Sequence, residues 1–309
     1  MLKKIFISVI LIIAVLSFVV SLLGGKNNWH TAKVVKGDSI AVIDVSGAMV
    51  SGDDGPTRAF VSAEGTSSGS VMRELRNAAD DSNVKAVLLR INSPGGSVTS
   101  AEEIAREIAK FKEKSKKPIV AAMGNTGASA AYYIAAPCDK IYANSSTLTG
   151  SIGVYMAGMN LEEIYKKIGI NTVLIKSGVH KDIMSPNRPM TAEERTIIQN
   201  MVNEMYEQFI TTVSEGRKKP LEEVRALADG RIYTGKQAKE LGLVDEIGNF
   251  YDAVDGTAKL AGISGKPKIK EYSRNANWTS LFMNSFIQSL SAKMLEQLPA
   301  PQGSQWNKG

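Results

Sequence analysis

Apolar strand patterns alternate with helical segments along most of this chain, and this alternation constrains the fold more than any other feature. Residues 40–45, 84–91 and 119–123 are apolar runs, the first bounded by turn-forming residues, as expected of buried strands. Residues 71–80 and 100–114 between them are predicted to be helical. Because strands joined through helices usually pair in parallel, we expect an α/β fold with the sheet buried between helices.

The alternation continues in the second half of the chain. Further short elements are predicted there: strands near 140–143, 152–155 and 172–176, and a helix over 161–168. Thr191 and Glu194 have the spacing of a capping box at the start of a long helix that extends to about Arg217. Apolar positions keep helical spacing along it and are predicted to be core: Ile197, Ile198, Met201, Val202, Met205, Phe209 and Val213.

The N-terminus predicts a membrane anchor. Lys3 and Lys4 precede an uncharged run over 5–23, which at about 1.5 Å per residue nearly spans a hydrocarbon core of about 30 Å. The positive-inside rule keeps residues 1–4 cytoplasmic and sends the rest across the cell membrane. A cleaved signal peptide is the alternative, but its apolar core is usually shorter, and no small-x-small cleavage site follows. We therefore expect a single-pass anchor, then a polar linker over 26–38.

Composition limits the chemistry of the body. Cys138 is the single cysteine, so no internal disulfide forms, and a buried structural thiol is the expected role. The net charge of +6 is modest, and no basic stripe with interleaved aromatic residues suggests nucleic acid. The motifs HExxH and CxxC are absent, as is the phosphate-binding pattern of P-loops. We expect neither a metal nor a cofactor.

Ser129 lies among glycine and alanine residues at the predicted start of a helix. A helix N-terminus presents free N–H groups and partial positive charge, which stabilise an anion formed there. Small neighbours also let a substrate backbone approach closely. A serine that only caps the helix is the alternative. The loop Pro94-Gly95-Gly96, which also follows a strand and precedes a helix, favours the catalytic interpretation, because paired glycines can direct N–H groups toward an oxyanion.

Lys181, which lies 52 positions after Ser129, could serve as the general base in place of a histidine. A neutral lysine amine can take the proton of a serine hydroxyl, and burial favours the neutral form. Ser151 is a plausible hydrogen-bond partner for that amine. His180 competes as the base, with Asp182 as its partner, but adjacent side chains on an extended segment point in opposite directions. His180 and Lys181 therefore cannot both face the serine.

At these residues the chain resembles the signal peptide peptidase A family of serine–lysine peptidases, which is related to the Clp protease subunit and to crotonase. The resemblance covers roughly residues 38 to 262 and includes the stretch 229–248. It implies a fold of stacked βαβ units, with a serine peptidase domain at 39–265. It also implies that Ser129 is the nucleophile, Lys181 the general base and Ser151 the residue that orients the lysine.

By the same resemblance, the backbone N–H groups of Gly96 and Ala130 form the oxyanion hole. The family often has Ser-Gly-Gly where this chain has Ser129-Ala130-Ala131. The resemblance further implies a homo-oligomeric ring in which serine and lysine come from neighbouring protomers. The resemblance also implies that the substrates are remnant signal peptides, which are apolar segments near membrane lipid. The expected activity is thus a membrane-anchored serine endopeptidase with an extracytoplasmic catalytic domain.

Two other functions remain open from the sequence. A crotonase-like enzyme acting on a thioester would also use a Gly-Gly oxyanion hole and would bind coenzyme A. An inactive membrane scaffold would not react with serine-directed probes. The C-terminal tail, residues 266–309, is expected to be partly disordered, with an amphipathic helix over 278–297. That helix would either occupy the substrate path or pack on the body.

Overall fold

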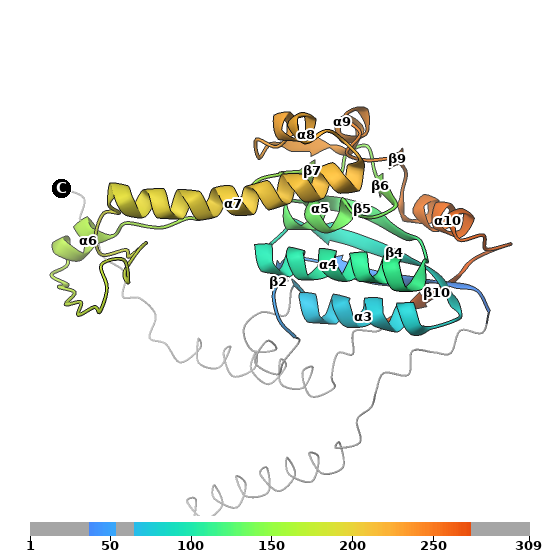
Figure 1. The fold of residues 1–309 in the computed structure, drawn as a ribbon, viewed down its shortest axis with the longest axis horizontal. Helices are drawn as coiled ribbons and strands as arrows, with labels where there is room; N and C mark the ends of the chain where they lie inside the picture. The colour runs from blue at the N-terminus through green and yellow to red at the C-terminus, as the bar shows by residue number, and fades with distance from the viewer. Residues whose placement is uncertain (1–36, 54–64, 273–309) are drawn as a thin grey trace, which may run out of the picture. The chain divides into compact units, whose positions relative to one another are not determined.

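The computed structural model describes residues 37–53 and 65–272, and these form an α/β fold around a mainly parallel sheet (Figure 1). The main sheet contains β1 (Ser39–Ser46), β4 (Val84–Ser93), β5 (Ile119–Ala128), β6 (Lys140–Ala143), β7 (Leu148–Gly150), β8 (Ile232–Thr234), β9 (Glu246–Ile247) and β10 (Lys268–Glu271). Its order is β10-β1-β4-β5-β6-β9, and β7 pairs with both β5 and β8. Within the described residues, only the β7–β8 pairing is antiparallel. The predicted α/β class is confirmed.

A second, two-stranded sheet joins β2 (Ala48–Val50) to β3 (Gly65–Ser67) in parallel. Residues 268–271, which the sequence analysis assigned to the tail, form β10 and pair with β1. The body therefore extends past residue 265. The predicted tail helix and the predicted anchor over 5–23 both lie outside the described residues. Within the described ranges, no helix has the length and apolar character needed to cross a membrane.

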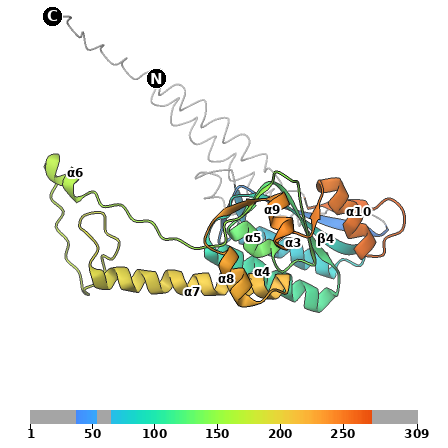
Figure 2. The same cartoon turned by 90° about the horizontal axis from the view of Figure 1, so that it is seen from above.

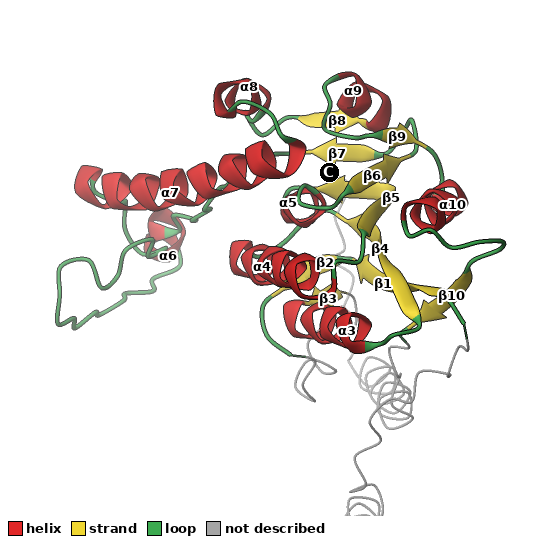
Figure 3. Ribbon diagram, turned by 45° about the vertical axis from the view of Figure 1, so that its right-hand side comes forward, coloured by secondary structure: helices red, strands yellow, loops and turns green. Residues whose placement is uncertain are grey.

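The alternation of side chains along the central strands explains the two layers that cover the sheet (Figure 3). Ile40 and Val42 of β1 face α10 (Phe250–Leu260) and pack with its buried Val254. Ile43 and Val45 face the other way, into the larger core. That core is shared with α3 (Ser68–Asp80), α4 (Val98–Ser115) and α5 (Ala130–Ala135). Burial on both faces of β1 is typical of a parallel sheet.

Capping residues fix where several helices begin. Ser67 caps α3, and its side chain accepts a hydrogen bond from the Ser70 N–H. Ser97 caps α4 in the same way, so this helix begins two residues earlier than predicted. Thr191 and Glu194 form the predicted capping box at the start of α7 (Ala192–Arg217). That prediction is confirmed.

The core prediction for α7 is correct only at the C-terminal end of the helix. Phe209 and Val213 are buried, but the five apolar residues before them are not: Ile197, Ile198, Met201, Val202 and Met205. The first half of α7 extends beyond the sheet together with residues 154–190 and α6 (Glu162–Lys167), as Figures 1 and 2 show. Residues 154–190 and the first half of α7 are called the arm below. The helical spacing could not show that these five side chains are left at least partly exposed within the described part of the chain.

The predicted strands at 152–155 and 172–176 are absent from the arm and its base. The strand expected first lies a few residues earlier, as β7. The second prediction is wrong: among the residues that the structure describes, no strand pairs with 172–176, and Val173 and Ile175 are 86% and 94% exposed. The C-terminal half of α7 already packs on the body, and α8 (Leu221–Leu227) and α9 (Gly235–Glu240) follow it there.

Candidate active site

Ser129 lies at the junction of β5 and α5, where it is the N-cap residue of the helix. Its backbone has φ 55° and ψ −125°, and positive φ is uncommon for any residue other than glycine. Strained residues of this kind persist only where the surrounding structure holds them, and they cluster at functional sites. The side chain is partly exposed, so a substrate can reach it.

The hydroxyl of Ser129 does not cap α5. Ser67, Ser97 and Thr191 each accept a hydrogen bond from the first turn of the helix they precede, whereas Ser129 makes no such bond. A residue that only capped the helix would make that bond at an ordinary extended φ. The capping alternative from the sequence therefore fails, and the hydroxyl is free for other chemistry.

A rigid scaffold holds Ser129. Its backbone N–H donates to the Gly150 carbonyl at 2.9 Å, and its carbonyl accepts from the Tyr133 N–H at 2.9 Å. All six residues of α5 are buried. Tyr132 donates from its hydroxyl to the Leu243 carbonyl at 2.8 Å, and burial raises the pKa of this phenol, so it remains a neutral donor. The helix after Ser129 is thus fixed by hydrogen bonds and close packing.

The Gly95-Gly96 loop contacts Ser129 directly. A Cβ built on Gly95 would lie 2.8 Å from the Ser129 Cβ and 2.9 Å from the Ala130 nitrogen. On its other side, the loop is held by Met49 of β2, which donates to the Gly95 carbonyl and accepts from the Ser97 N–H, both at 2.9 Å. In such a parallel bridge, Gly96 directs its own N–H away from Met49. Ala130 is the first residue of α5, so its N–H has no intrahelical acceptor.

Ser151 lies beside the same junction. Gly150, which precedes it, pairs with Ala128 across β5 and β7 and accepts the Ser129 N–H. Ser151 has a positive φ of 50°, and its N–H donates to the Arg231 carbonyl at 2.8 Å. The structure therefore brings together four of the five residues predicted for the site: Ser129, Ser151, Gly96 and Ala130.

Lys181 is not brought to Ser129 within one chain. It lies in the arm, next to His180, whose Nδ1 is 4.0 Å from Oε1 of Glu194 in the first turn of α7. The aromatic ring of Phe209, fifteen positions later, packs on Tyr133 with 5.0 Å between ring centroids. At about 1.5 Å per residue, the intervening helix is about 22 Å long. Lys181 is exposed, and its neighbour His180 contacts the end of α7 opposite to the end that packs on Tyr133.

The Ser-His-Asp alternative has no support in the geometry. His180 is in the arm with Lys181, and its imidazole lies 3.5 Å from the carboxylate of Glu193 and 4.0 Å from that of Glu194. Asp182 is bound to Lys176 and Arg188 instead of His180. These contacts exclude Asp182 as the residue that would orient a catalytic histidine in this conformation.

Cys138 is buried, as predicted, and its thiol lies 3.6 Å from the Ile134 carbonyl. Burial raises the pKa of this thiol to about 12, which keeps it protonated at neutral pH. The prediction of a buried thiol is confirmed.

Two features of the site were not predicted from the sequence. Met49 holds the glycine loop through backbone atoms alone, so its side chain carries no signal of that role. Arg188 joins Asp182 to Glu194 in the arm. Its position three residues before Thr191, the first residue of the capping box, was a usable signal that a cation lies near the start of α7.

Comparison with known proteins places the chain in a family. The model of peptidase family S49 matches residues 111–264. The chain is 39% identical over 248 residues to "Putative signal peptide peptidase SppA" of Enterococcus faecium, which covers 80% of this chain and 71% of that protein. Over 269 residues it is 35% identical to Protease 4 of Salmonella typhi, which covers 86% of this chain and 42% of that protein. It is also 30% identical over 248 residues to the chloroplastic serine protease SPPA of Arabidopsis thaliana, with 79% of this chain and 36% of that protein covered.

These matches and the site at the end of β5 define a serine protease of the α/β class. The chain belongs to the signal peptide peptidase A family, peptidase family S49.

Proposed function

We propose that this chain is a membrane-anchored serine endopeptidase with Ser129 as its nucleophile. The observation that carries the proposal is the uncapped serine at φ 55°, in contact with a loop of paired glycines. The strained junction exposes the hydroxyl, while the first N–H of α5 and that of Gly96 lack acceptors in their own elements. These two N–H groups would bind the oxyanion formed when the serine attacks a peptide carbonyl.

Lys181 is the proposed general base, and it acts on Ser129 of a neighbouring copy. Three observations support an assembly that joins them. Lys181 lies far from Ser129 of its own chain and is exposed, although a neutral base needs a desolvated setting. The arm also exposes large apolar side chains, including Tyr155 at 86%, Val173 at 86% and Ile175 at 94%. Contact with a second copy would bury these side chains and desolvate the amine.

Ser151 is the proposed partner of the lysine amine. It is one residue from Gly150, whose carbonyl holds the backbone of Ser129, so a lysine arriving at Ser129 would also meet Ser151. A hydrogen bond from the amine to its hydroxyl would hold the amine toward the nucleophile.

The proposed substrates are remnant signal peptides at the cell membrane, with the catalytic domain outside the cytoplasm. The basis is the family, together with the apolar run over 5–23 behind Lys3 and Lys4. Apolar peptides released in the bilayer would meet an enzyme held there by its own anchor.

A fluorophosphonate probe applied to the full-length protein in detergent tests the nucleophile and the base together. Wild type should be labelled, Ser129→Ala should not, and Ser67→Ala, which removes a capping serine elsewhere, should be labelled normally. Lys181→Ala should react slowly and His180→Ala at much of the wild-type rate, because only the lysine would take the proton of the serine hydroxyl. Undiminished labelling and hydrolysis by Ser129→Ala would refute the proposal. Coenzyme A binding without labelling would favour the thioester enzyme.

A further inference from the structure

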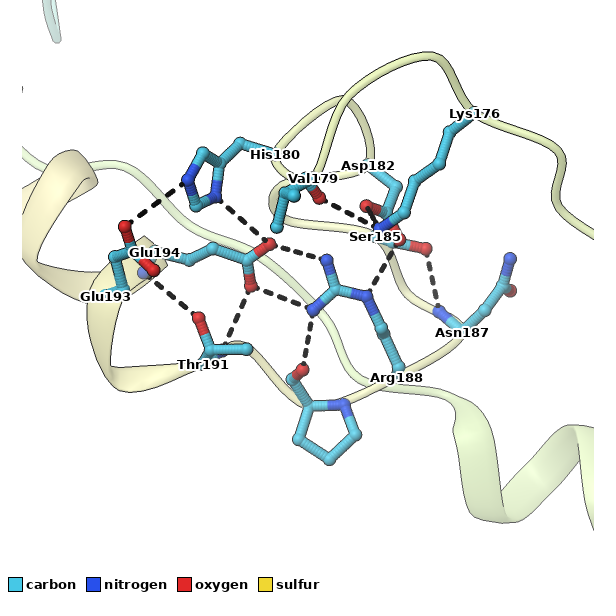
Figure 4. A network of polar contacts seen from close by, with 11 residues as sticks. Lys176, Val179, His180, Asp182, Ser185, Asn187, Arg188, Thr191, Glu193 and Glu194 are labelled. Carbon is cyan, nitrogen blue, oxygen red and sulfur yellow. Dashed lines mark hydrogen bonds and ion pairs between the residues drawn. The ribbon is translucent and has the colours of Figure 1, made fainter.

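A turn-rich segment, residues 176–185, carries Lys181 and is docked on the first turn of α7 by charged side chains (Figure 4). Lys176 donates from Nζ to the Val179 carbonyl at 2.9 Å and to Oδ1 of Asp182 at 2.6 Å. The Ser185 N–H donates to the Asp182 carbonyl at 2.9 Å. Asp182 therefore ties together both ends of the segment.

Arg188 connects this segment to α7. Its Nε donates to Oδ2 of Asp182 at 2.8 Å. Its Nη1 and Nη2 donate to the two carboxylate oxygens of Glu194 at 2.8 and 2.5 Å. Paired N–H donors that meet both oxygens of a carboxylate fix orientation as well as distance. One guanidinium thus sets the position of Asp182 relative to the start of the helix.

Glu194 is itself held firmly. Its side chain is 2% exposed, and its carboxylate accepts from the Thr191 N–H at 3.0 Å as part of the capping box. Hydrogen bonding to Arg188 lowers the pKa of Glu194 to about 2 and holds the pKa of Asp182 well below its usual range. Both carboxylates are therefore charged at neutral pH, and their ion pairs with Arg188 stay intact. Arg188, Asp182 and Glu194 are together called the clamp below.

The clamp replaces an apolar core that this segment does not have. No residue from 171 to 190 is buried. A segment without buried apolar contacts opens easily unless other interactions fix it. Here those interactions converge on Arg188, and Asp182, the residue directly after Lys181, is one of its two carboxylate partners.

We propose that Arg188 is the positioning residue for Lys181, because it locks the turn on both sides of the lysine onto α7. Asp182 is bound by Arg188 directly, and His180 lies against Glu193 and Glu194 at 3.5 and 4.0 Å. Lys181 itself makes no side-chain hydrogen bond or ion pair with another residue of the described part of the chain. Its amine is thus held in place by its neighbours while remaining free to reach Ser129 of another copy. This inference rests on the proposed function of Lys181.

The test compares Arg188→Ala and Arg188→Lys with Arg225→Ala in the full-length, detergent-solubilised protein. Arg225 is a matched control, since it also makes a two-pronged ion pair with a glutamate of α7, Glu207, but far from Lys181. Arg188→Ala should lower kcat about 100-fold with KM changed less than about twofold, because a misplaced base slows the chemical step only. The kcat of Arg188→Lys should lie between those of Arg188→Ala and wild type, and the kcat of Arg225→Ala should match that of wild type.

Three further measurements separate positioning from general damage. Guanidinium at millimolar concentration should restore part of the kcat of Arg188→Ala, while its assembly size and Tm stay those of wild type. In a Lys181→Ala background, Arg188→Ala should cause no further loss in the fluorophosphonate labelling rate, since both changes act through one amine. The inference would be overturned if Arg188→Ala had the kcat of wild type. It would also be overturned by a further loss of labelling rate in the Lys181→Ala background, or by a loss of assembly in Arg188→Ala that guanidinium does not rescue. Full activity of Lys181→Ala would instead refute the proposed base itself.

Discussion

Gly95 and Ser129 are in van der Waals contact, although they lie at the ends of different strands. A Cβ added to Gly95 would be only 2.8 Å from that of Ser129, and Gly95 has φ +105°, which L side chains rarely adopt. The contact is possible because glycine has no side chain and tolerates this φ. It joins the loop that offers the Gly96 N–H to the helix that offers the Ala130 N–H.

Gly95→Ala should therefore abolish most peptidase activity and destabilise the fold by about 1–3 kcal/mol. The added methyl group pushes the loop away from Ser129, and the backbone at this φ becomes strained. Activity on a peptide substrate and Tm measure the two effects. Gly52→Ala is the control, because Gly52 has φ +98° but no atom of the described residues lies within 4 Å of an added Cβ. Equal losses in the two variants would mean that strain alone, rather than contact with Ser129, explains the result.

The strain at Ser129 predicts that glycine is more stable than alanine at this position. Ser129→Ala and Ser129→Gly should both be inactive, but the glycine variant should be more stable than the alanine variant by about 1 kcal/mol. Glycine adopts φ 55° and ψ −125° without steric cost, whereas alanine keeps the Cβ that makes this conformation unfavourable. Denaturant midpoints measured side by side decide the matter. A less stable glycine variant would show that the junction is not strained.

The sequence predicted the body of the fold better than the arm, and the reason is where apolar residues find partners. Apolar runs such as 84–91 are buried within their own chain, so their pattern reports their structure. Val173 and Ile175 are equally apolar but exposed, and a pattern cannot show whether the partner belongs to another copy. A strand was therefore predicted where the single chain has none.

For the candidate site too, local features could be predicted from the sequence and long-range relations could not. Short-range features were readable: a serine between a strand and a helix, paired glycines after another strand, and the capping box of α7. The Lys181 assignment rested on resemblance, because no local pattern relates an exposed lysine to a serine 52 positions away. The positive φ of Ser129 and the missing cap bond are three-dimensional facts that no residue type encodes.

Phe209 joins the scaffold of Ser129 to the helix that carries the arm. Its ring packs on Tyr133 of α5 with 5.0 Å between centroids, and it is 3% exposed. Phe209→Ala should lower the free energy of unfolding by about 3 kcal/mol, through lost burial and the cavity left behind. Tyr251→Ala removes an aromatic ring that is 72% exposed and should change stability by less than about 0.5 kcal/mol. Similar Tm shifts for both variants would contradict this account of α7 packing.

Mixing two inactive variants tests whether the dyad forms between copies. Ser129→Ala retains the lysine and Lys181→Ala retains the serine, so a mixed assembly contains some complete pairs. Random co-assembly of equal amounts should restore about a quarter of the sites, because each site needs one copy of each kind in the right order. Co-expression with two affinity tags, followed by a peptide assay on doubly purified material, gives the measurement. No recovery in assemblies shown to contain both variants would place the dyad within one chain or exclude it.

The arm should loosen in acid before the body does. Hydrogen bonding to Arg188 lowers the pKa of Glu194 from its ordinary 4.5 to about 2, so the loosened arm binds more protons than the docked one between these values. Docking is therefore fully stabilised by this group above about pH 4.5 and loses that contribution as the pH falls toward about 2.

Hydrogen-exchange protection factors over residues 176–194 should fall between pH 7 and pH 3, while those of β4 and β5 change little. Glu194→Gln, which cannot titrate, should show weak protection of the arm at both pH values. Protection that is unchanged at pH 3 in wild type, or that falls equally in Glu194→Gln, would show that the Arg188–Glu194 pair does not hold the arm.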